Sequence, residues 1–383
     1  MRSFWFIAFF MGGCSSPKEK PSADVADEAE VDSSESTPDS GEDPGVDPLS
    51  WSVTTPGPYR VGYLNMDVTY SPGASFEDRT IRLNIWYPTD QEDGSRSEYT
   101  VGIDELAFSE AEPAVPAHGG GYPLHVHSHG FKGYGATSAF LSRYFASHGW
   151  VTVAPDHTQN TLIDHVEPLP SAHYFHRPLD VRASIDAISV IPADHLLGGL
   201  INPERVVLSG HSFGAYTTWA SLGSSYDLGN VAEMCSTGEG IHADGCTPEE
   251  EAMFSTALSD ERVVSSIPMA GTIRRSWFGN AGELTVNGPV LFFGGTEDDR
   301  GQQEQFDQMG DIDFTWMEIE GACHQSFALG ACESLDVDLG FSIIQTASLA
   351  FARITVLADS TPEALSIANG ETSIADVVTV QRR

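Results

Sequence analysis

The sequence contains very little basic charge. Of its 383 residues only 19 are lysine or arginine, whereas 55 are aspartate or glutamate, and only three are lysine. The resulting formal net charge of −36 argues against nucleic-acid binding through a basic surface. It also argues against electrostatic attachment to anionic lipid.

Long apolar runs are missing as well. The run Phe4–Met11 has eight residues, and about 20 are needed to cross a bilayer as a helix. We therefore expect no membrane-spanning helix. Hydrophobic residues nevertheless make up 40% of the chain and aromatic residues 10%. That content supports a substantial core, in one large domain or in one domain with extensions.

Cysteine is scarce, with five in the whole chain. One lies near the N-terminus, and the other four are Cys235, Cys246, Cys323 and Cys332. An even number in an exported chain suggests two disulfides. Three pairings are possible, and proximity favours Cys235–Cys246 and Cys323–Cys332. Zinc binding is the alternative, and the absence of C-x-x-C spacing argues against it.

The N-terminus is typical of an export signal, with Arg2, the apolar run and two glycines before Cys14. It resembles a bacterial lipoprotein signal, which implies that Cys14 is lipidated and that the protein lies in the cell envelope. An ordinary signal peptide with an incidental cysteine is the alternative. Residues 15–50 contain eleven acidic residues against two lysines. Such a segment is predicted to be a disordered linker to a domain at 51–383.

Apolar strand patterns alternate with helical patterns along residues 51–383. The predicted strands are Val61–Tyr70, Thr80–Tyr87, Tyr122–His127, Val151–Ala154, Arg205–Ser209, Arg262–Pro268, Val290–Phe293 and Phe314–Ile319. The predicted helices are 135–148, Arg177–Ile191, Phe213–Leu222 and Gly340–Ala358. This alternation predicts an α/β fold with a doubly wound, mostly parallel sheet covered on both faces. Residues 222–260 interrupt the pattern, and we interpret them as a cap-like insertion.

The motif at Gly210–Gly214 reads Gly-His-Ser-Phe-Gly. It follows the apolar strand Val206–Ser209 and precedes a helix, which is the context of a nucleophile elbow. This geometry would expose Ser212 at the edge of the sheet and direct the backbone N–H of Phe213 towards a developing oxyanion. The motif therefore predicts Ser212 as a nucleophile.

A serine nucleophile needs a base and an acid, which follow it along the chain in this fold. After Ser212 the sequence contains two histidines, His242 in the insertion and His324 after a predicted strand. His324 is therefore the predicted base. The preceding strand ends near Glu297, Asp298 and Asp299. We choose Asp298, which would orient the imidazole, and the other two acids remain alternatives.

A second oxyanion donor is expected in the loop after the strand Tyr122–His127. The N–H of Phe131 is the candidate. His125, His127 and His129 alternate in this region and would share one strand face if the strand continued. A metal cluster is one interpretation of them. The simpler interpretation, which we prefer, is three structural histidines, with His129 supporting the oxyanion loop.

Seven segments carry a family resemblance: Gly57–Gly62, Ile85–Pro88, Ser128–Phe131, Ala146–Trp150, Arg177–Asp180, Gly210–Gly214 and His324–Phe327. Through them the chain resembles an α/β-hydrolase of the bacterial platelet-activating-factor acetylhydrolase and predicted dienelactone hydrolase group. They lie between about 57 and 330. The resemblance implies a triad of Ser212, Asp298 and His324 with Phe131 and Phe213 as oxyanion donors. A weaker similarity to cutinase-type polyester hydrolases rests on Ala146–Gly149 and the elbow.

These features together predict an exported, lipid-anchored serine hydrolase of short-to-medium acyl esters. It would work through an acyl-enzyme and need neither a cofactor nor a metal. Its partner would be a small or polymeric ester, and membrane contact would come only through the lipid on Cys14. A polyester or lipid hydrolase is the near alternative, and a serine peptidase a more distant one. An inactive surface-binding module of the same fold is a different class.

Overall fold

The computed structural model describes residues 47–237 and 245–383, all of which belong to one unit, Gly45–Arg383. Cys14, the predicted signal and most of the predicted linker lie outside the described residues, as does His242. The last residues of the predicted linker are ordered, contrary to the prediction of disorder. They form a 3-10 helix, η1 (Pro48–Ser50), and the Leu49 carbonyl accepts a hydrogen bond from Arg353.

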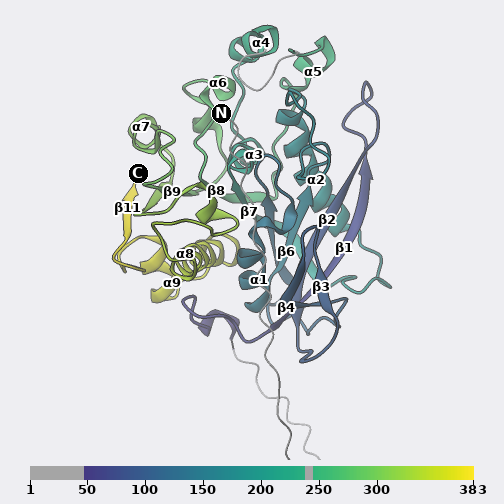
Figure 1. The fold of residues 1–383 in the computed structure, drawn as a ribbon, viewed down its shortest axis with the longest axis vertical. Helices are drawn as coiled ribbons and strands as arrows, with labels where there is room; N and C mark the ends of the chain where they lie inside the picture. The colour runs from purple at the N-terminus through teal and green to yellow at the C-terminus, as the bar shows by residue number, and fades with distance from the viewer. Residues whose placement is uncertain (1–46, 238–244) are drawn as a thin grey trace, which may run out of the picture. The chain divides into compact units, whose positions relative to one another are not determined.

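One eleven-stranded sheet runs through the described residues (Figure 1). Its strands are β1 (Arg60–Tyr70), β2 (Arg79–Thr89), β3 (Arg96–Glu98), β4 (Ile103–Ser109), β5 (Tyr122–Ser128), β6 (Val151–Asp156), β7 (Ile201–His211), β8 (Val263–Met269), β9 (Val290–Gly295), β10 (Phe314–Ile319) and β11 (Val378–Arg382). The spatial order is β11-β10-β9-β8-β7-β5-β6-β2-β1-β4-β3. The central strands from β10 to β6 pair in parallel, and antiparallel pairs flank them on both sides.

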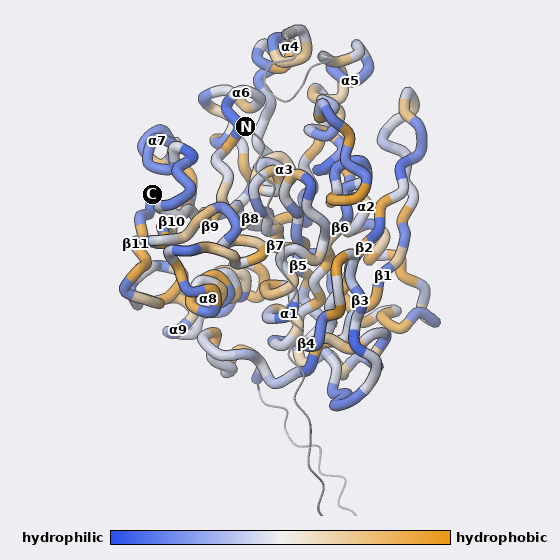
Figure 2. The backbone as a smooth tube through the Cα atoms, in the orientation of Figure 1, coloured by the Kyte–Doolittle hydropathy of each residue, from blue (hydrophilic) through white to orange (hydrophobic). Residues whose placement is uncertain are grey.

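Helices connect the strands. They are α1 (Ala139–Ser147), α2 (His173–Ser189), α3 (Phe213–Leu222), α4 (Leu228–Thr237), α5 (Pro248–Met253), α6 (Arg275–Phe278), α7 (Gln302–Gln308), α8 (Val337–Leu357) and α9 (Pro362–Ala368). Further 3-10 helices are η2 (Gly135–Ser138), η3 (Gly282–Thr285) and η4 (His324–Phe327). Figure 2 shows hydrophobic residues along α8 and a hydrophilic α7.

The two faces of the sheet bury different helices. Val206 and Leu208 of β7 pack in one apolar cluster with α2 and α3, whereas Val207 packs in another with α1 and α8. Successive strand residues point to opposite faces, so one strand contributes to both cores. The predicted doubly wound α/β sheet, covered on both faces, is confirmed.

The chain order reverses at β5. From β5 the chain crosses through α1 to β6 on one side, and it later enters β7 on the other side and continues to β8. The carboxyl ends of β5 and β7 are therefore neighbours whose connections leave in opposite directions. In open α/β sheets such a switch point leaves a crevice in which ligands bind.

Several element predictions need correction. Helix α2 begins at His173 rather than Arg177, so Pro178 lies inside the helix and not near its start. Proline has no N–H for the carbonyl four residues earlier, and that carbonyl, of Tyr174, accepts from the Tyr216 hydroxyl at 2.7 Å. The strands β3, β4 and β11, at or next to the two edges of the sheet, were not predicted. β3 and β11 are short, and in β4 Ile103 and Leu106 remain exposed, so apolar alternation is weak.

Helix α8 bears on the expectation that no helix spans a membrane. It has 21 residues with a mean hydropathy of 1.4 in its most apolar window, so by length and composition it could cross a membrane. Within the structure 67% of that window is buried, because α8 packs across one face of the sheet. The packing of α8 is that of a core helix.

The predicted insertion at 222–260 contains α4 and α5, joined by the disulfide Cys235–Cys246. It packs against α6 and its neighbours. The Asp227 N–H donates to the carbonyl of Trp277 at 3.0 Å, and the Asn230 amide donates to the carbonyl of Arg275 at 3.0 Å. Its role as a cap over a binding site stays a prediction.

A buried ion pair fixes α8 to the start of the domain. Arg353 is 2% exposed, its Nε donates to Asp359 at 2.7 Å, and its other nitrogens donate to the carbonyls of Trp51 and Leu49. We expect Arg353→Met to lower the free energy of unfolding by about 3–5 kcal/mol, because Asp359 would be left buried and unpaired. Chemical denaturation measures this change.

The control is Arg382→Met, which removes an exposed pair with Asp313. Its expected effect is below about 1 kcal/mol. Equal losses of unfolding free energy in the two variants would contradict a stabilising role for the buried Arg353–Asp359 pair.

Candidate active site

Ser212 occupies a sharp turn between the end of β7 and the first residue of α3. Its φ of 57° places it in the left-handed region, which is strained for a residue with a Cβ. The Ser212 N–H donates to the carbonyl of Met269 at 2.9 Å and so ties the turn to β8. The side chain is partly exposed, so its hydroxyl lies at the rim of the sheet, as the motif predicts.

The two glycines of the motif are required by contact. A Cβ on Gly210 would lie 2.2 Å from the carbonyl oxygen of Gly214, and a Cβ on Gly214 would lie 1.9 Å from that of Ser128. Real Cβ atoms do not approach backbone so closely. The second contact brings the end of β5 directly against the turn that carries Ser212.

The structure places His324 between Ser212 and Asp298. Its Nε2 is 2.9 Å from Ser212 Oγ, and its Nδ1 is 2.7 Å from Asp298 Oδ2. The imidazole is 26% exposed, whereas the carboxylate is 7% exposed. A hydroxyl, an imidazole and a carboxylate therefore form one hydrogen-bonded series, in the arrangement that activates a serine.

The carboxylate of Asp298 remains ionised in this setting. Burial alone would raise its pKa, but hydrogen bonds from His324 and Arg300 outweigh burial and hold the pKa below its ordinary value. Arg300 Nε donates to Asp298 Oδ1 at 2.7 Å. Since the folded-state pKa is depressed, the stabilisation is present above the unfolded-state pKa. It is lost as the pH falls through the folded-state value.

The alternative acids are not brought to His324. Glu297 and Asp299 are both exposed, and the Asp299 carboxylate accepts from the N–H of Gly301 at 2.8 Å within its own turn. The alternative base, His242, lies outside the described residues.

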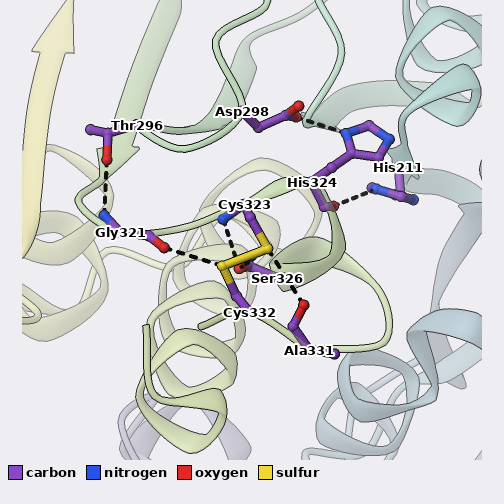
Figure 3. The surroundings of a disulfide bond; sticks show 9 residues. All are labelled: His211, Thr296, Asp298, Gly321, Cys323, His324, Ser326, Ala331 and Cys332. Carbon is purple, nitrogen blue, oxygen red and sulfur yellow. Dashed lines mark hydrogen bonds and ion pairs between the residues drawn. A yellow bond between two sulfur atoms is a disulfide. The ribbon is translucent and has the colours of Figure 1, made fainter. Parts of the chain in front are cut away.

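Two adjoining loops hold Asp298 and His324. The Thr296 hydroxyl accepts from the Gly321 N–H at 2.9 Å, and the Glu297 N–H donates to the Ala322 carbonyl at 3.0 Å. Figure 3 shows the disulfide Cys323–Cys332 closing the loop that begins at His324. Both cysteine pairings favoured by proximity are therefore present.

His211, the variable residue of the motif, supports His324, the predicted base. Its Nε2 is 2.9 Å from the backbone carbonyl of His324, to which it donates (Figure 3). Burial lowers the pKa of His211 to about 3, so the ring is neutral and its Nε2 carries the proton. This bond fixes the backbone from which the imidazole of His324 projects.

The predicted oxyanion donors flank the nucleophile. A Cβ on Gly130 would lie 3.2 Å from the Cβ of Ser212, so the loop leading to Phe131 runs beside the hydroxyl. Phe213 directly follows Ser212 as the first residue of α3. Among the described residues, no hydrogen-bond acceptor is found for the N–H of Phe131 or of Phe213. Both groups are thus open to a ligand oxygen.

The alternating histidines are explained by hydrogen bonds. His125 bonds Thr152 at 3.0 Å and Ser209 at 2.7 Å, and His127 bonds the same Ser209 hydroxyl at 2.7 Å. Strand β5 ends at Ser128, so His129 does not continue their face. Within residues 47–237 and 245–383 no group of three or more potential ligands is arranged to hold a metal ion. The geometry favours structural histidines.

Sequence reasoning missed Arg300 and the support given by His211. Arg300 follows Asp298 by two residues, and His211 lies within the motif itself, so both were visible only as neighbours of predicted residues. Arg177, which appeared in the family resemblance without a role, lies beside this site.

No protein-family model matches the chain, and no curated protein matches it. A solved structure of a ferulic acid esterase from Streptomyces cinnamoneus is similar, with a TM-score of 0.56 and 18% sequence identity. The match covers 81% of this chain and 94% of the esterase chain. At this identity the likeness establishes the fold, which is that of the esterase. It does not establish the narrower hydrolase group of the resemblance.

The contact at Gly214 gives a direct test of the turn. We expect Gly214→Ala to lower the free energy of unfolding by about 1–3 kcal/mol, because the added methyl meets backbone that cannot move aside. The control is Gly119→Ala, since Gly119 is exposed and a Cβ there meets nothing within 4 Å. Urea denaturation compares the two, and an unchanged Gly214→Ala protein would contradict the close packing.

The two disulfides form a matched pair. They close segments of similar sequence separation, 9 and 11 residues, so replacing either pair by serine should cost about 2–3 kcal/mol of stability. Only the loss of Cys323–Cys332 should speed amide hydrogen exchange in η4, because that disulfide alone closes the loop of His324. Equal exchange in η4 for both double variants would contradict this role.

Proposed function

We propose that this protein is a serine hydrolase of carboxylic esters, with Ser212 as nucleophile, His324 as base and Asp298 as the orienting acid. The observation that carries the proposal is the series Ser212 Oγ, His324 and Asp298, with contacts of 2.9 and 2.7 Å at the two ring nitrogens. The strained turn and the two open N–H groups beside it support the same chemistry.

The reaction follows from these groups. His324 Nε2 takes the proton of Ser212 Oγ as the oxygen attacks the ester carbonyl carbon, and the N–H groups of Phe131 and Phe213 hold the oxyanion. His324 then gives the proton to the departing alcohol, which leaves an acyl-enzyme. In the second half of the reaction, His324 takes a proton from water as the water oxygen attacks the acyl-enzyme. It then returns the proton to Ser212 Oγ as the carboxylic acid is released. Each oxyanion donor contributes about a hundredfold or more in rate, and no cofactor or metal takes part.

The proposed substrates are esters with short-to-medium acyl groups. The partly exposed Ser212 and His324 are consistent with entry of esters from solvent. The structural likeness to a ferulic acid esterase supports an ester rather than a peptide as substrate. A polyester or lipid hydrolase remains the alternative within the same chemistry.

We also propose export and lipid anchoring through Cys14. Two disulfides in the domain are consistent with an oxidising compartment, and the acidic sequence before the domain would act as a tether.

The test is hydrolysis of p-nitrophenyl esters of increasing chain length, followed by polymer film and peptide panels. Ser212→Ala should lower kcat by at least about ten-thousandfold, and Asp298→Asn by about a thousandfold or more. The control is Glu297→Gln, which changes an exposed neighbouring acid and should leave kcat within about twofold. A fluorophosphonate should label Ser212 in the wild type.

Two results would contradict the proposal. One is failure of the fluorophosphonate to label Ser212, which would favour an inactive binding module. The other is ester turnover that Ser212→Ala leaves intact.

A further inference from the structure

We propose that Arg177 is a positioning residue of the oxyanion hole, which its guanidinium holds in shape from behind. The inference rests on the proposed function, because it assigns a role within that reaction. Arg177 touches neither Ser212 nor His324 in the hydrogen bonds of the structure. It acts through the backbone that carries the Phe131 N–H.

The guanidinium contacts the loop after β5 at consecutive carbonyls. One terminal nitrogen donates to the carbonyl of His129 at 2.6 Å, and the other donates to that of Gly130 at 3.2 Å. The first also reaches the Ser128 hydroxyl at 3.3 Å. A planar fork of this kind fixes direction as well as distance, so Arg177 sets the path of the backbone at this point.

The orientation of one peptide follows from these bonds. The peptide between Gly130 and Phe131 is trans, so its C=O and N–H point in opposite directions. Its carbonyl is held by Arg177, by His129 Nδ1 at 2.7 Å and by the Gly133 N–H at 3.1 Å. The Phe131 N–H must therefore point away from the guanidinium, and Gly130 lies against Ser212.

The protonation state of His129 supports this arrangement. Its Nε2 accepts from the backbone N–H of His157 at 3.0 Å, so its proton is on Nδ1, which donates to the Gly130 carbonyl. Burial lowers the pKa of His129 well below its ordinary value, and the ring stays neutral. A second proton, on Nε2, would point at the backbone N–H of His157, which is itself a donor.

Arg177 is itself firmly held. It is completely buried, Asn160 Oδ1 accepts from its Nε at 3.2 Å, and its guanidinium lies 4.3 Å from the ring centre of Phe213. The same side chain thus contacts the loop of one proposed donor and the ring of the other. Its hydrogen-bonded acceptors within the described residues are all neutral, so its charge is not cancelled by a directly bonded carboxylate.

Burying such a cation is energetically unfavourable, and burial therefore lowers its pKa. Burial lowers the pKa of Arg177 to about 9, although nearby Asp180 opposes this shift. The guanidinium is still charged at neutral pH. From behind the loop, its charge adds positive potential to the oxyanion hole that the loop would form.

A second Ser-His-Asp series lies behind this loop. His157 bonds Ser128 Oγ at 2.8 Å and Asp180 at 2.8 Å, which also binds Arg79. All three side chains of the series are fully buried, so Ser128 cannot meet a substrate. The series braces the residue at which the loop begins.

The experiment compares Arg177→Lys with Arg182→Lys in the full chain. Lysine keeps the positive charge but lacks the fork. Arg182 lies on the same helix and also donates to backbone carbonyls, those of Ala257 and Ser259, away from Ser212. We expect Arg177→Lys to lower kcat for a p-nitrophenyl ester by about ten- to a hundredfold, which is less than the loss of a whole donor. KM should change by less than about threefold.

Inhibition by a boronic acid distinguishes a positioning role in the oxyanion hole from a general structural role. Phenylboronic acid forms a tetrahedral adduct with a nucleophilic serine, so its inhibition constant should rise with the fall in kcat, because only the tetrahedral species needs the hole. Arg182→Lys should leave kcat, KM and the inhibition constant within about twofold. If Arg177→Lys also leaves kcat and the inhibition constant within twofold, the proposal is wrong.

A second variant covers the case in which Arg177→Lys does not fold. Asn160→Ser removes the acceptor that holds the guanidinium and should give a smaller fall of the same type, in kcat and in boronate binding but not in KM. Equal losses in kcat and KM would instead indicate a general structural role. If the wild type neither turns over esters nor reacts with fluorophosphonate, the proposed function itself fails. That outcome differs from an active wild type whose kcat is unaffected by Arg177→Lys.

Discussion

The close approach of two backbone segments is the constraint on which this site depends. Gly214, just inside α3, lies so near the carbonyl of Ser128 at the end of β5 that no side chain can be accommodated at position 214. The approach follows from the topology, since β5 and β7 are adjacent parallel strands whose connections diverge. Because the strands end side by side, a hydroxyl from one loop and an N–H from another can meet at one point.

Charge is distributed around this point in an uneven way. On one side Arg300 and His324 keep the Asp298 carboxylate ionised. On the other, Arg177 brings positive charge behind the loop after β5, and the histidines that pack there are kept neutral by burial. The arrangement places fixed donors where a proposed intermediate would gain negative charge.

The sequence predicted those parts of the fold that depend on local pattern. The parallel strands and their helices were visible because buried strands form continuous apolar runs. The turn at Ser212 was visible because its steric demands select glycine on both sides. The positions of Asp298 and His324 followed from chain order in this type of fold.

What the sequence did not reveal depends on contacts between distant segments. The start of α2 was misplaced because proline is usually found in a first turn of a helix. Here Pro178 lies inside the helix, and the Tyr216 hydroxyl donates to the Tyr174 carbonyl in place of the missing proline N–H. Arg300 donates to Asp298 and His211 donates to the carbonyl of His324, through bonds that only the folded loops create. The strands β3, β4 and β11 carry too little apolar alternation to stand out from loops.

The members of the candidate site lie far apart along the polypeptide, from Phe131 after β5 to His324 beyond β10. Until most of the sheet has assembled, the hydroxyl at position 212 is chemically no different from that of any other serine. The proposed reactivity therefore requires the finished architecture. Under the proposed function, a newly made or partly degraded chain would carry no active centre with which to damage its surroundings.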